Sequence, residues 1–298
     1  MNESDKFYSP RLNKELHVGF FGVGYDYYWN QFPGLFEELM EKHQVIMEKV
    51  PREAVKIIDF GMVDNPSKAY ETVLKMQAAN LDVLFCNMLT YATSGTFGVI
   101  ARAIDVPIIL VALQPRKALD YSKASTYMQL ANDDICSLPE FTGVASRMGK
   151  RIPDVIIGTL YDDPEADKRI AAFCRVARVL KGLKQAHFGH IGHPINAMLD
   201  MHTDITMLTT FFGCHVVECE ANEIVDRYVN CREEEIEAAE KTILDFFDTP
   251  DPVSDPIAVK LRKEDLRTSA QVAVALRKFV ENKKIDGLAY YYNGSPDS

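Results

Sequence analysis

The sequence has few positive charges relative to its negative ones, and this shortage excludes one class of partner. It contains 33 lysine and arginine residues against 43 aspartate and glutamate residues, which gives a formal net charge of -10 at pH 7. Binding to DNA or RNA depends on cationic side chains that neutralise phosphates. We therefore expect no nucleic-acid partner, whereas small polar ligands are compatible with this composition.

Long apolar runs and export signals are also absent. No segment approaches the roughly 18 consecutive apolar residues of a membrane helix, and the polar, acidic start (residues 1–15) lacks the basic and apolar regions of a secretory signal. The six cysteines are scattered and form no Cys-x-x-Cys pair, which favours free thiols in a reducing compartment. We therefore expect a cytoplasmic protein with no membrane partner.

Sequence motifs for nucleotides and zinc are incomplete or missing. Gly22 and Gly24 lie at the end of the first predicted strand, but Tyr27 replaces the third glycine of a dinucleotide-binding loop, and no Walker-type loop occurs. The histidines of "HFGHIGH" (187–193) lack the glutamate and the helical spacing of a zinc-protease motif, so we interpret them as a strand end rather than a metal site. His190 is a candidate for contact with a polar substrate, because strand-end loops hold ligands in α/β sheets.

Short β-rich apolar runs alternate with segments of helical period along the chain. This alternation is typical of parallel sheets covered by helices on both faces, so we expect an α/β fold with two doubly wound, Rossmann-like or flavodoxin-like domains in tandem. The pattern restarts after a long predicted helix that begins at Asp163 and Pro164 and ends at Gly182. We place an N-terminal domain in residues 1–182 and a middle domain in residues 183–298.

The expected elements follow this division. In the first half, the predicted strands are residues 16–24, 44–50, 55–63, 81–89 and 106–115, and the predicted helices are residues 29–43, 66–80 and 96–104. In the second half, the predicted strands are residues 185–192, 215–221 and 285–293, and the predicted helices are residues 203–213, 233–248 and 264–284. Because no helix follows to cover the last strand, we expect a C-terminal part to be missing from this chain.

Polar side chains end two of the predicted strands. Asn87, Thr90 and Tyr91 close one strand, and Gln114 and Arg116 close another. Amides, hydroxyls and a guanidinium suit hydrogen bonding to a polyhydroxylated ligand, and they equally suit the capping of strand ends in solvated turns.

An aromatic group with one carboxylate follows the first predicted strand, where Tyr25, Tyr27, Tyr28 and Trp29 surround Asp26. These rings either face a sugar or pack as a hydrophobic loop against a helix or a neighbouring subunit. Asp26 is the polar residue that we single out from this group.

Two longer stretches carry a specific resemblance. Residues 190–224 contain a strand, a glycine-containing turn, a "MLDM-x-T-D" helix start and an "FG-x-HV" strand. Residues 82–114 contain a Cys-x-Met-x-Thr-aromatic run and a later strand that ends in glutamine. In order and spacing these stretches resemble the N-terminal and middle domains of the L-arabinose/L-fucose isomerase superfamily, and the resemblance spans approximately residues 16–298.

The resemblance implies part of a metal-dependent aldose–ketose isomerase of carbohydrate metabolism. In such an enzyme a divalent cation such as Mn2+ polarises O1 and O2 of the sugar, while a carboxylate moves a proton between C1 and C2 through an enediol. The family's metal-binding glutamates and histidine come from the C-terminal part, so the resemblance implies no metal ligand and no catalytic residue in this chain, which we expect to be inactive alone. It also implies a homo-oligomer of the hexameric type.

By position, the resemblance implies that contacts from one subunit into another's active site fall on Asp26, Tyr28, Tyr91 and Gln114. Asn293 and Ser295 would line the near edge of the same subunit's own site. Arabinose isomerases usually carry Gln in place of Asp26 and Leu in place of Tyr28, so the identity of the sugar stays open. An alternative is a non-catalytic sugar-binding or regulatory module that closes on its ligand by a hinge motion.

Overall fold

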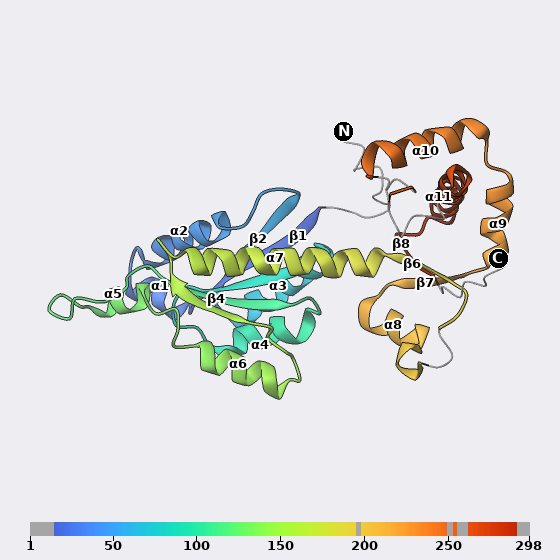
Figure 1. The fold of residues 1–298 in the computed structure, drawn as a ribbon. Helices are drawn as coiled ribbons and strands as arrows, with labels where there is room; N and C mark the ends of the chain where they lie inside the picture. Colours follow the sequence, from blue (N-terminus) through green and yellow to red (C-terminus); the bar gives the residue numbers. More distant parts are fainter. Residues whose placement is uncertain (1–14, 195–197, 249–252, 255–261, 291–298) are drawn as a thin grey trace. The chain divides into compact units, whose positions relative to one another are not determined.

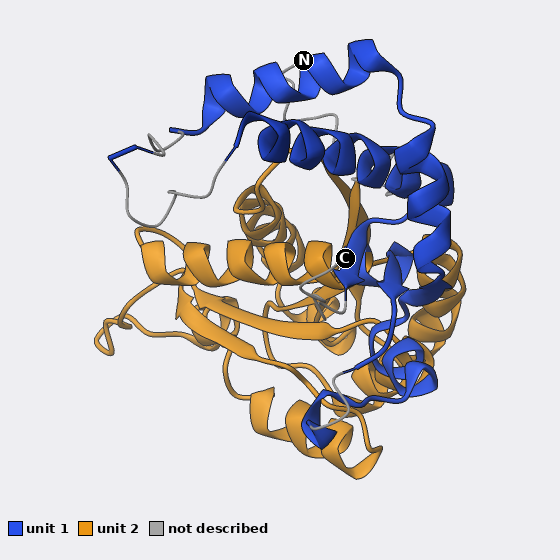
Figure 2. Cartoon of the chain, turned by 45° about the vertical axis from the view of Figure 1, so that its right-hand side comes forward, with its two compact units in different colours: residues 1–12, 182–298 blue, residues 13–181 orange. Residues whose placement is uncertain are grey.

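The computed structural model describes residues 15–194, 198–248, 253–254 and 262–290. Among these, residues 15–181 form one compact unit and residues 182–290 form another, and Figure 2 shows them in orange and blue. We call them the N-terminal unit and the C-terminal unit. Each contains a parallel sheet with helices, so the predicted α/β fold with tandem parallel sheets is confirmed.

A five-stranded sheet forms the centre of the N-terminal unit (Figure 1). Its strands lie in the order β2 (Val55–Val63), β1 (Leu16–Val23), β3 (Val83–Met88), β4 (Ile108–Gln114) and β5 (Val155–Thr159), and every neighbouring pair is parallel. Because β1 lies between β2 and β3, the direction of progress across the sheet reverses at β1. The carboxyl ends of β1 and β3, which we call the switch point, border the crevice where doubly wound sheets bind ligands.

Helices cover both faces of this sheet. One face packs against α2 (Leu35–Glu48), α5 (Thr126–Ala131) and α7 (Pro164–Gln185), and the short α1 (Tyr27–Gln31) precedes α2. The other face packs against α3 (Pro66–Ala78), α4 (Ser94–Ala103) and α6 (Leu138–Arg147). Stacked buried rings lie on each face, Phe20 with Phe85 and Phe97 with Phe141. Each such ring stabilises the fold by about 1.5–3 kcal/mol through burial alone.

The predicted strand at residues 44–50 is wrong, because these residues end α2. Leu35, Leu39, His43 and Met47 are buried at intervals of four residues, and the buried Ile46 lies three residues after His43, which places these side chains on one face of a continuous helix. The apolar run around Ile46 is too short to show this period by itself.

Two helix boundaries also differ from the prediction. The helix predicted over residues 29–43 is divided into α1 and α2 at Pro33 and Gly34, where Gly34 has a positive φ of 88° that a side chain would strain. The long helix begins as predicted after Asp163, whose Oδ1 accepts the Ala166 N–H at 3.1 Å. It continues beyond Gly182 to Gln185, since a lone glycine weakens a helix without ending it.

The C-terminal unit has a three-stranded parallel sheet in the order β7 (His215–Cys219), β6 (His187–Ile191) and β8 (Gly287–Tyr290). Its helices are α8 (Ile205–Phe212), α9 (Ala221–Val229), α10 (Glu233–Phe246) and α11 (Lys263–Lys283), with a 3-10 turn, η2 (Leu199–Met201). Ile191, Cys219, Phe279 and Ile285 form its buried cluster. Sequence analysis predicted these strands and helices except α9 and η2.

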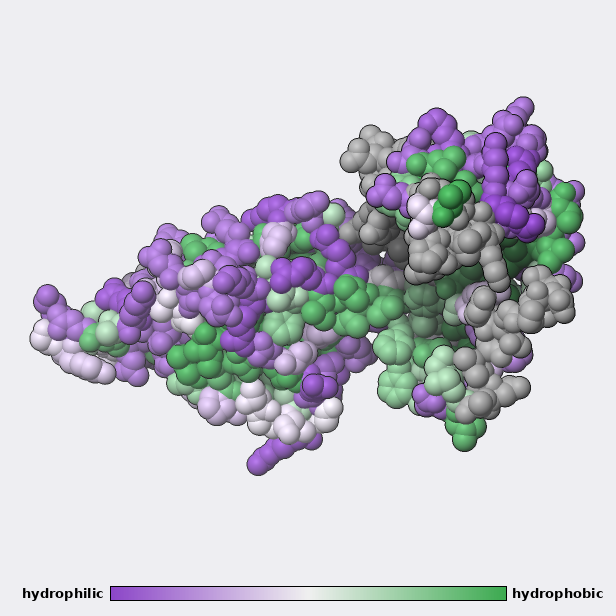
Figure 3. Space-filling view, viewed as in Figure 1, coloured by the Kyte–Doolittle hydropathy of each residue, from purple (hydrophilic) through white to green (hydrophobic). Residues whose placement is uncertain are grey.

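Some apolar surface is exposed in this unit. The described part of α8 contains no buried residue, and Phe211 is 72% exposed. Figure 3 shows hydrophobic side chains gathered over this helix. Within the described residues, no helix combines the length and apolar character required to cross a membrane.

Candidate binding site

An aromatic and carboxylate cluster lies at the switch point. The ring centroid of Tyr25 lies 5.4 Å from that of Tyr28 and 6.3 Å from that of Tyr91, both in edge-on contacts. Tyr25 and Tyr28 follow β1 and Tyr91 follows β3, so loops far apart in sequence meet here. Three predicted site residues, Asp26, Tyr28 and Tyr91, therefore lie at one place, and we call them with Tyr25 the switch-point cluster.

Residues that follow β2 hold Asp26 in place. Asn65 Nδ2 donates to Asp26 Oδ2 at 3.2 Å. The amide of Asn65 has a fixed orientation, because its Oδ1 accepts the backbone N–H of Lys68 at 3.0 Å as the N-cap of α3. Asp64, which is buried, accepts a hydrogen bond from Trp29 Nε1 at 2.9 Å. These bonds join the ends of β1 and β2 beside the switch-point cluster.

Tyr28 and Tyr91 of the cluster remain protonated at neutral pH. Burial raises the pKa of Tyr28, and the neighbouring Tyr91 and Asp133 raise it further. Burial likewise raises the pKa of Tyr91, with Glu140 adding to the effect. A neutral phenol can donate a hydrogen bond to a ligand oxygen.

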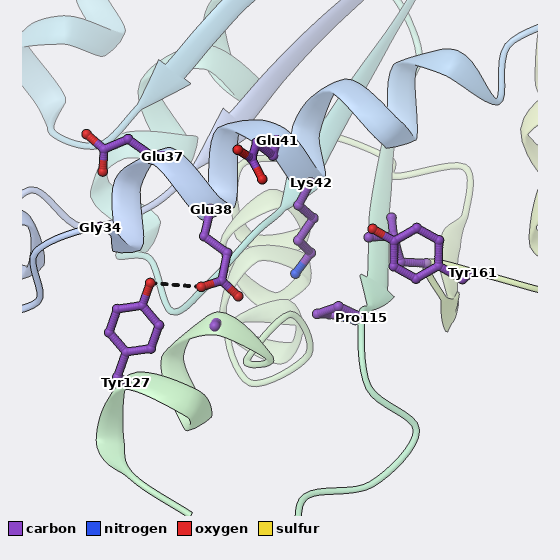
Figure 4. A pocket seen from close by; sticks show the side chains of 10 residues that line it. Gly34, Glu37, Glu38, Glu41, Lys42, Pro115, Tyr127 and Tyr161 are labelled. Carbon is purple, nitrogen blue, oxygen red and sulfur yellow. Dashed lines mark hydrogen bonds between the residues drawn. The ribbon is translucent and has the colours of Figure 1, made fainter.

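A cavity of about 510 Å³ adjoins the carboxyl ends of β4 and β5 (Figure 4). It is lined by Gly34, Glu37, Glu38, Glu41, Lys42, Pro115, Tyr127, Ala131, Leu160 and Tyr161, all of the N-terminal unit. Its volume is within the range of small-molecule sites. We call it the acidic cavity, because three glutamates of α2 line it.

Two polar contacts fix the walls of the acidic cavity. Tyr127 Oη donates to Glu38 Oε2 at 2.8 Å (Figure 4), and burial with this carboxylate raises the pKa of Tyr127 to about 12. Lys42 is buried, and its Nζ forms an ion pair with Asp134 and donates to Leu89 O at 3.1 Å. Burial lowers the pKa of Lys42 although Asp134 opposes this, and burial raises that of Asp134 to about 7.

Residues 132–134 join the acidic cavity to the switch-point cluster. Gln114, a predicted site residue, donates from Nε2 to Asn132 O at 2.7 Å and so anchors this segment to the end of β4. The charge of Asp133 acts on both Tyr28 and Lys42. The two groups of side chains therefore share one edge of the sheet.

The remaining predicted site residues lie elsewhere. His190 is in β6 of the C-terminal unit, in register with Glu218 of β7 and Ala289 of β8. Asn293 and Ser295 lie outside the described residues.

Sequence reasoning missed the glutamates of the acidic cavity. Their signal is an acidic face on α2, formed by Glu37, Glu38 and Glu41 opposite the buried Leu35 and Leu39. A charged helix face is usually solvated. Only the tertiary position of α5 and the end of β5 turns this face into a cavity wall.

A buried polar chain was also missed. His43 Nε2 lies 2.9 Å from Asp59 Oδ1, and its Nδ1 lies 3.0 Å from Asn87 Nδ2. His43 and Asn87 are fully buried, so this chain links α2 and β2 to the end of β3. Sequence analysis left Asn87 open between ligand binding and strand-end capping, and in the structure its amide meets the histidine.

The described residues do not fit a manganese site. They contain no group of three or more His, Cys, Asp or Glu side chains positioned to hold a metal ion. In Figure 4 the carboxylate of Glu37 points away from that of Glu38, which is bonded to Tyr127. No reaction step through a metal ion is assigned to these residues.

Comparisons with known proteins show little similarity. No protein-family model matches the chain, and no curated protein matches it. A conserved domain protein from Vibrio cholerae is 12% identical, with a TM-score of 0.26, over 93% of this chain and 90% of its own. A substrate-binding protein with adhesive properties from Clostridium difficile, in its ligand-free open form, is 12% identical, with a TM-score of 0.22, over 92% of this chain and 89% of its own.

Proposed function

We propose that this chain binds a sugar at the carboxyl edge of its five-stranded sheet, as the N-terminal and middle parts of a metal-dependent aldose–ketose isomerase. The observation that supports sugar binding best is the acidic cavity, which combines carboxylates with the rings of Tyr127 and Tyr161. Carboxylates accept hydrogen bonds from sugar hydroxyls, and aromatic rings pack against the apolar faces of a sugar. The isomerase part of the proposal is supported by the sequence resemblance.

In this proposal the chain's own residues bind and orient the sugar. Tyr28 and Tyr91 donate hydrogen bonds from their phenols, and Asp26 accepts one from a hydroxyl group. The metal ligands and the groups that move protons between C1 and C2 belong to a C-terminal part. We propose a cytoplasmic homo-oligomer, and the exposed apolar surface of α8 supports the oligomer, since large apolar patches commonly mark association surfaces.

The second candidate is a sugar-binding module without catalysis. One observation favours it: all the described residues that line the acidic cavity belong to the N-terminal unit, so binding there requires no further chain. Both candidate functions involve binding of a sugar, but only the first includes conversion of that sugar between its aldose and ketose forms.

Calorimetric titration of the chain with L-arabinose and L-fucose, with and without Mn2+, tests this proposal. We expect binding without metal, and a loss of about tenfold in affinity when Tyr161→Ala removes a ring from the cavity. Tyr70→Ala is a matched control, because both tyrosines are 55% exposed and Tyr70 on α3 lies outside the cavity. Absence of sugar binding contradicts the proposal, and metal-dependent conversion by this chain alone contradicts its isomerase part.

A further inference from the structure

The side chains that line the acidic cavity carry more negative than positive charge. Glu37, Glu38 and Glu41 line it, and among the described lining residues Lys42 is the sole basic one. Lys42 offsets at most one of the three glutamate charges, and its Nζ is already directed at the buried carboxyl group of Asp134. At least two negative charges of the cavity walls therefore remain uncompensated.

The geometry of the walls also suits a positive ligand group. Figure 4 shows Tyr127 and Tyr161 on two sides of the cavity, with Lys42 and Pro115 between them. The hydrogen bond from Tyr127 fixes the carboxylate of Glu38 at the cavity wall. An ammonium group donates three hydrogen bonds to such acceptors and is attracted to the faces of aromatic rings. A neutral sugar of the same size gains the hydroxyl contacts without the charge interaction.

We infer that the acidic cavity takes a sugar with a protonated amino group in preference to a neutral sugar. This inference rests on the proposed function, since it names the substrate class of the same site. The ammonium group lies beside Glu38 and Glu41, and the sugar ring lies against the tyrosines. Of the three glutamates, Glu38 is half-buried whereas Glu37 and Glu41 are exposed, so Glu38 should attract the ammonium group most strongly, because charges interact more strongly where water is partly excluded.

The test is calorimetric titration of the full chain with D-glucosamine, D-glucose and N-acetyl-D-glucosamine at about pH 6, where the amine is protonated. We expect glucosamine to bind about tenfold more tightly than the two neutral sugars, with a smaller difference in concentrated salt. Glu41→Gln and Glu38→Gln should each reduce glucosamine affinity about three- to tenfold and change glucose affinity less than about twofold. The amide oxygen that Glu38→Gln introduces still accepts the Tyr127 bond, so wall geometry is kept.

Glu48→Gln is the matched control, because Glu48 is an exposed glutamate of the same helix outside the cavity. It should leave all three affinities unchanged. Glucose binding as tightly as glucosamine overturns the inference and leaves the proposed function in place. No binding of any of the three sugars overturns the inference, whereas the proposed function is decided by the titration with L-arabinose and L-fucose. An equal effect of Glu48→Gln and Glu41→Gln also overturns the inference. The overall negative charge of the protein, rather than the carboxylates of the cavity, would then explain the preference for glucosamine.

Discussion

Asp64 fixes the orientation of the side chains beside the switch-point cluster. It is 6% exposed and accepts hydrogen bonds from Trp29 Nε1 at 2.9 Å and from Asn65 Nδ2 at 3.3 Å. Asp64→Ala leaves the indole N–H without this acceptor, so we expect the free energy of unfolding to fall by about 1–3 kcal/mol. Trp29 is the single tryptophan of the sequence, so urea unfolding followed by its fluorescence measures the loss.

Asp64→Asn is the control for this prediction, because it keeps an oxygen that can accept from Trp29. We expect it to cost less than half as much as Asp64→Ala. Equal costs would contradict the role of the hydrogen bond and indicate a role of charge, through the ion pair of Asp64 with Lys68 at 3.5 Å. Sequence alone singles out Asp26 from its aromatic neighbours, whereas Asp64 and Asn65 reach Asp26 only after β1 and β2 have paired.

Among the elements, Gly22 in β1 is required by packing. Its spacing from Gly24 resembles a dinucleotide loop in sequence, yet a Cβ atom at Gly22 would clash with Leu89 and lie 3.3 Å from His43 Nδ1. We expect Gly22→Ala to reduce the free energy of unfolding by about 1–3 kcal/mol through overpacking of β1 against Leu89, which follows β3, and against His43 of α2. Chemical denaturation of the variant checks this prediction.

Gly143 on α6 provides the matched control, because a Cβ atom there has no other atom within 4 Å. Gly143→Ala should stabilise the protein by about 0.5–1 kcal/mol, since glycine is unfavourable inside a helix. If Gly22→Ala were equally harmless, Leu89 and His43 would not pack closely against β1 at this position. The burial of one face of α2 also explains why the strand predicted at residues 44–50 is wrong. Ile46 belongs to this buried face, and the helical period of the face can be recognised only when Leu35 and Leu39 are considered together with Ile46.

At the scale of the whole molecule, the sequence predicts the fold class more completely than the site. Alternating apolar runs and helical periods are properties of short segments, so they reveal the α/β class and the strands of both sheets except β5, which was not predicted. The acidic cavity depends on where α5 and the end of β5 lie against α2, which no local pattern specifies. The family resemblance grouped Asp26, Tyr28 and Tyr91 in advance, and they lie together because strand ends of a parallel sheet share one edge.

The stability of the N-terminal unit should depend on pH through Asp134. Burial raises its pKa to about 7 from an ordinary value of 3.8. The folded state therefore holds a proton that the unfolded state has released between these values, and this contribution is lost as pH rises through 7. We expect the free energy of unfolding to fall by about 2 kcal/mol from pH 5 to pH 8. Trp29 fluorescence during urea unfolding reports on this unit, and Asp134→Asn, which cannot titrate, should show a flatter profile; parallel profiles would assign the pH dependence to other groups.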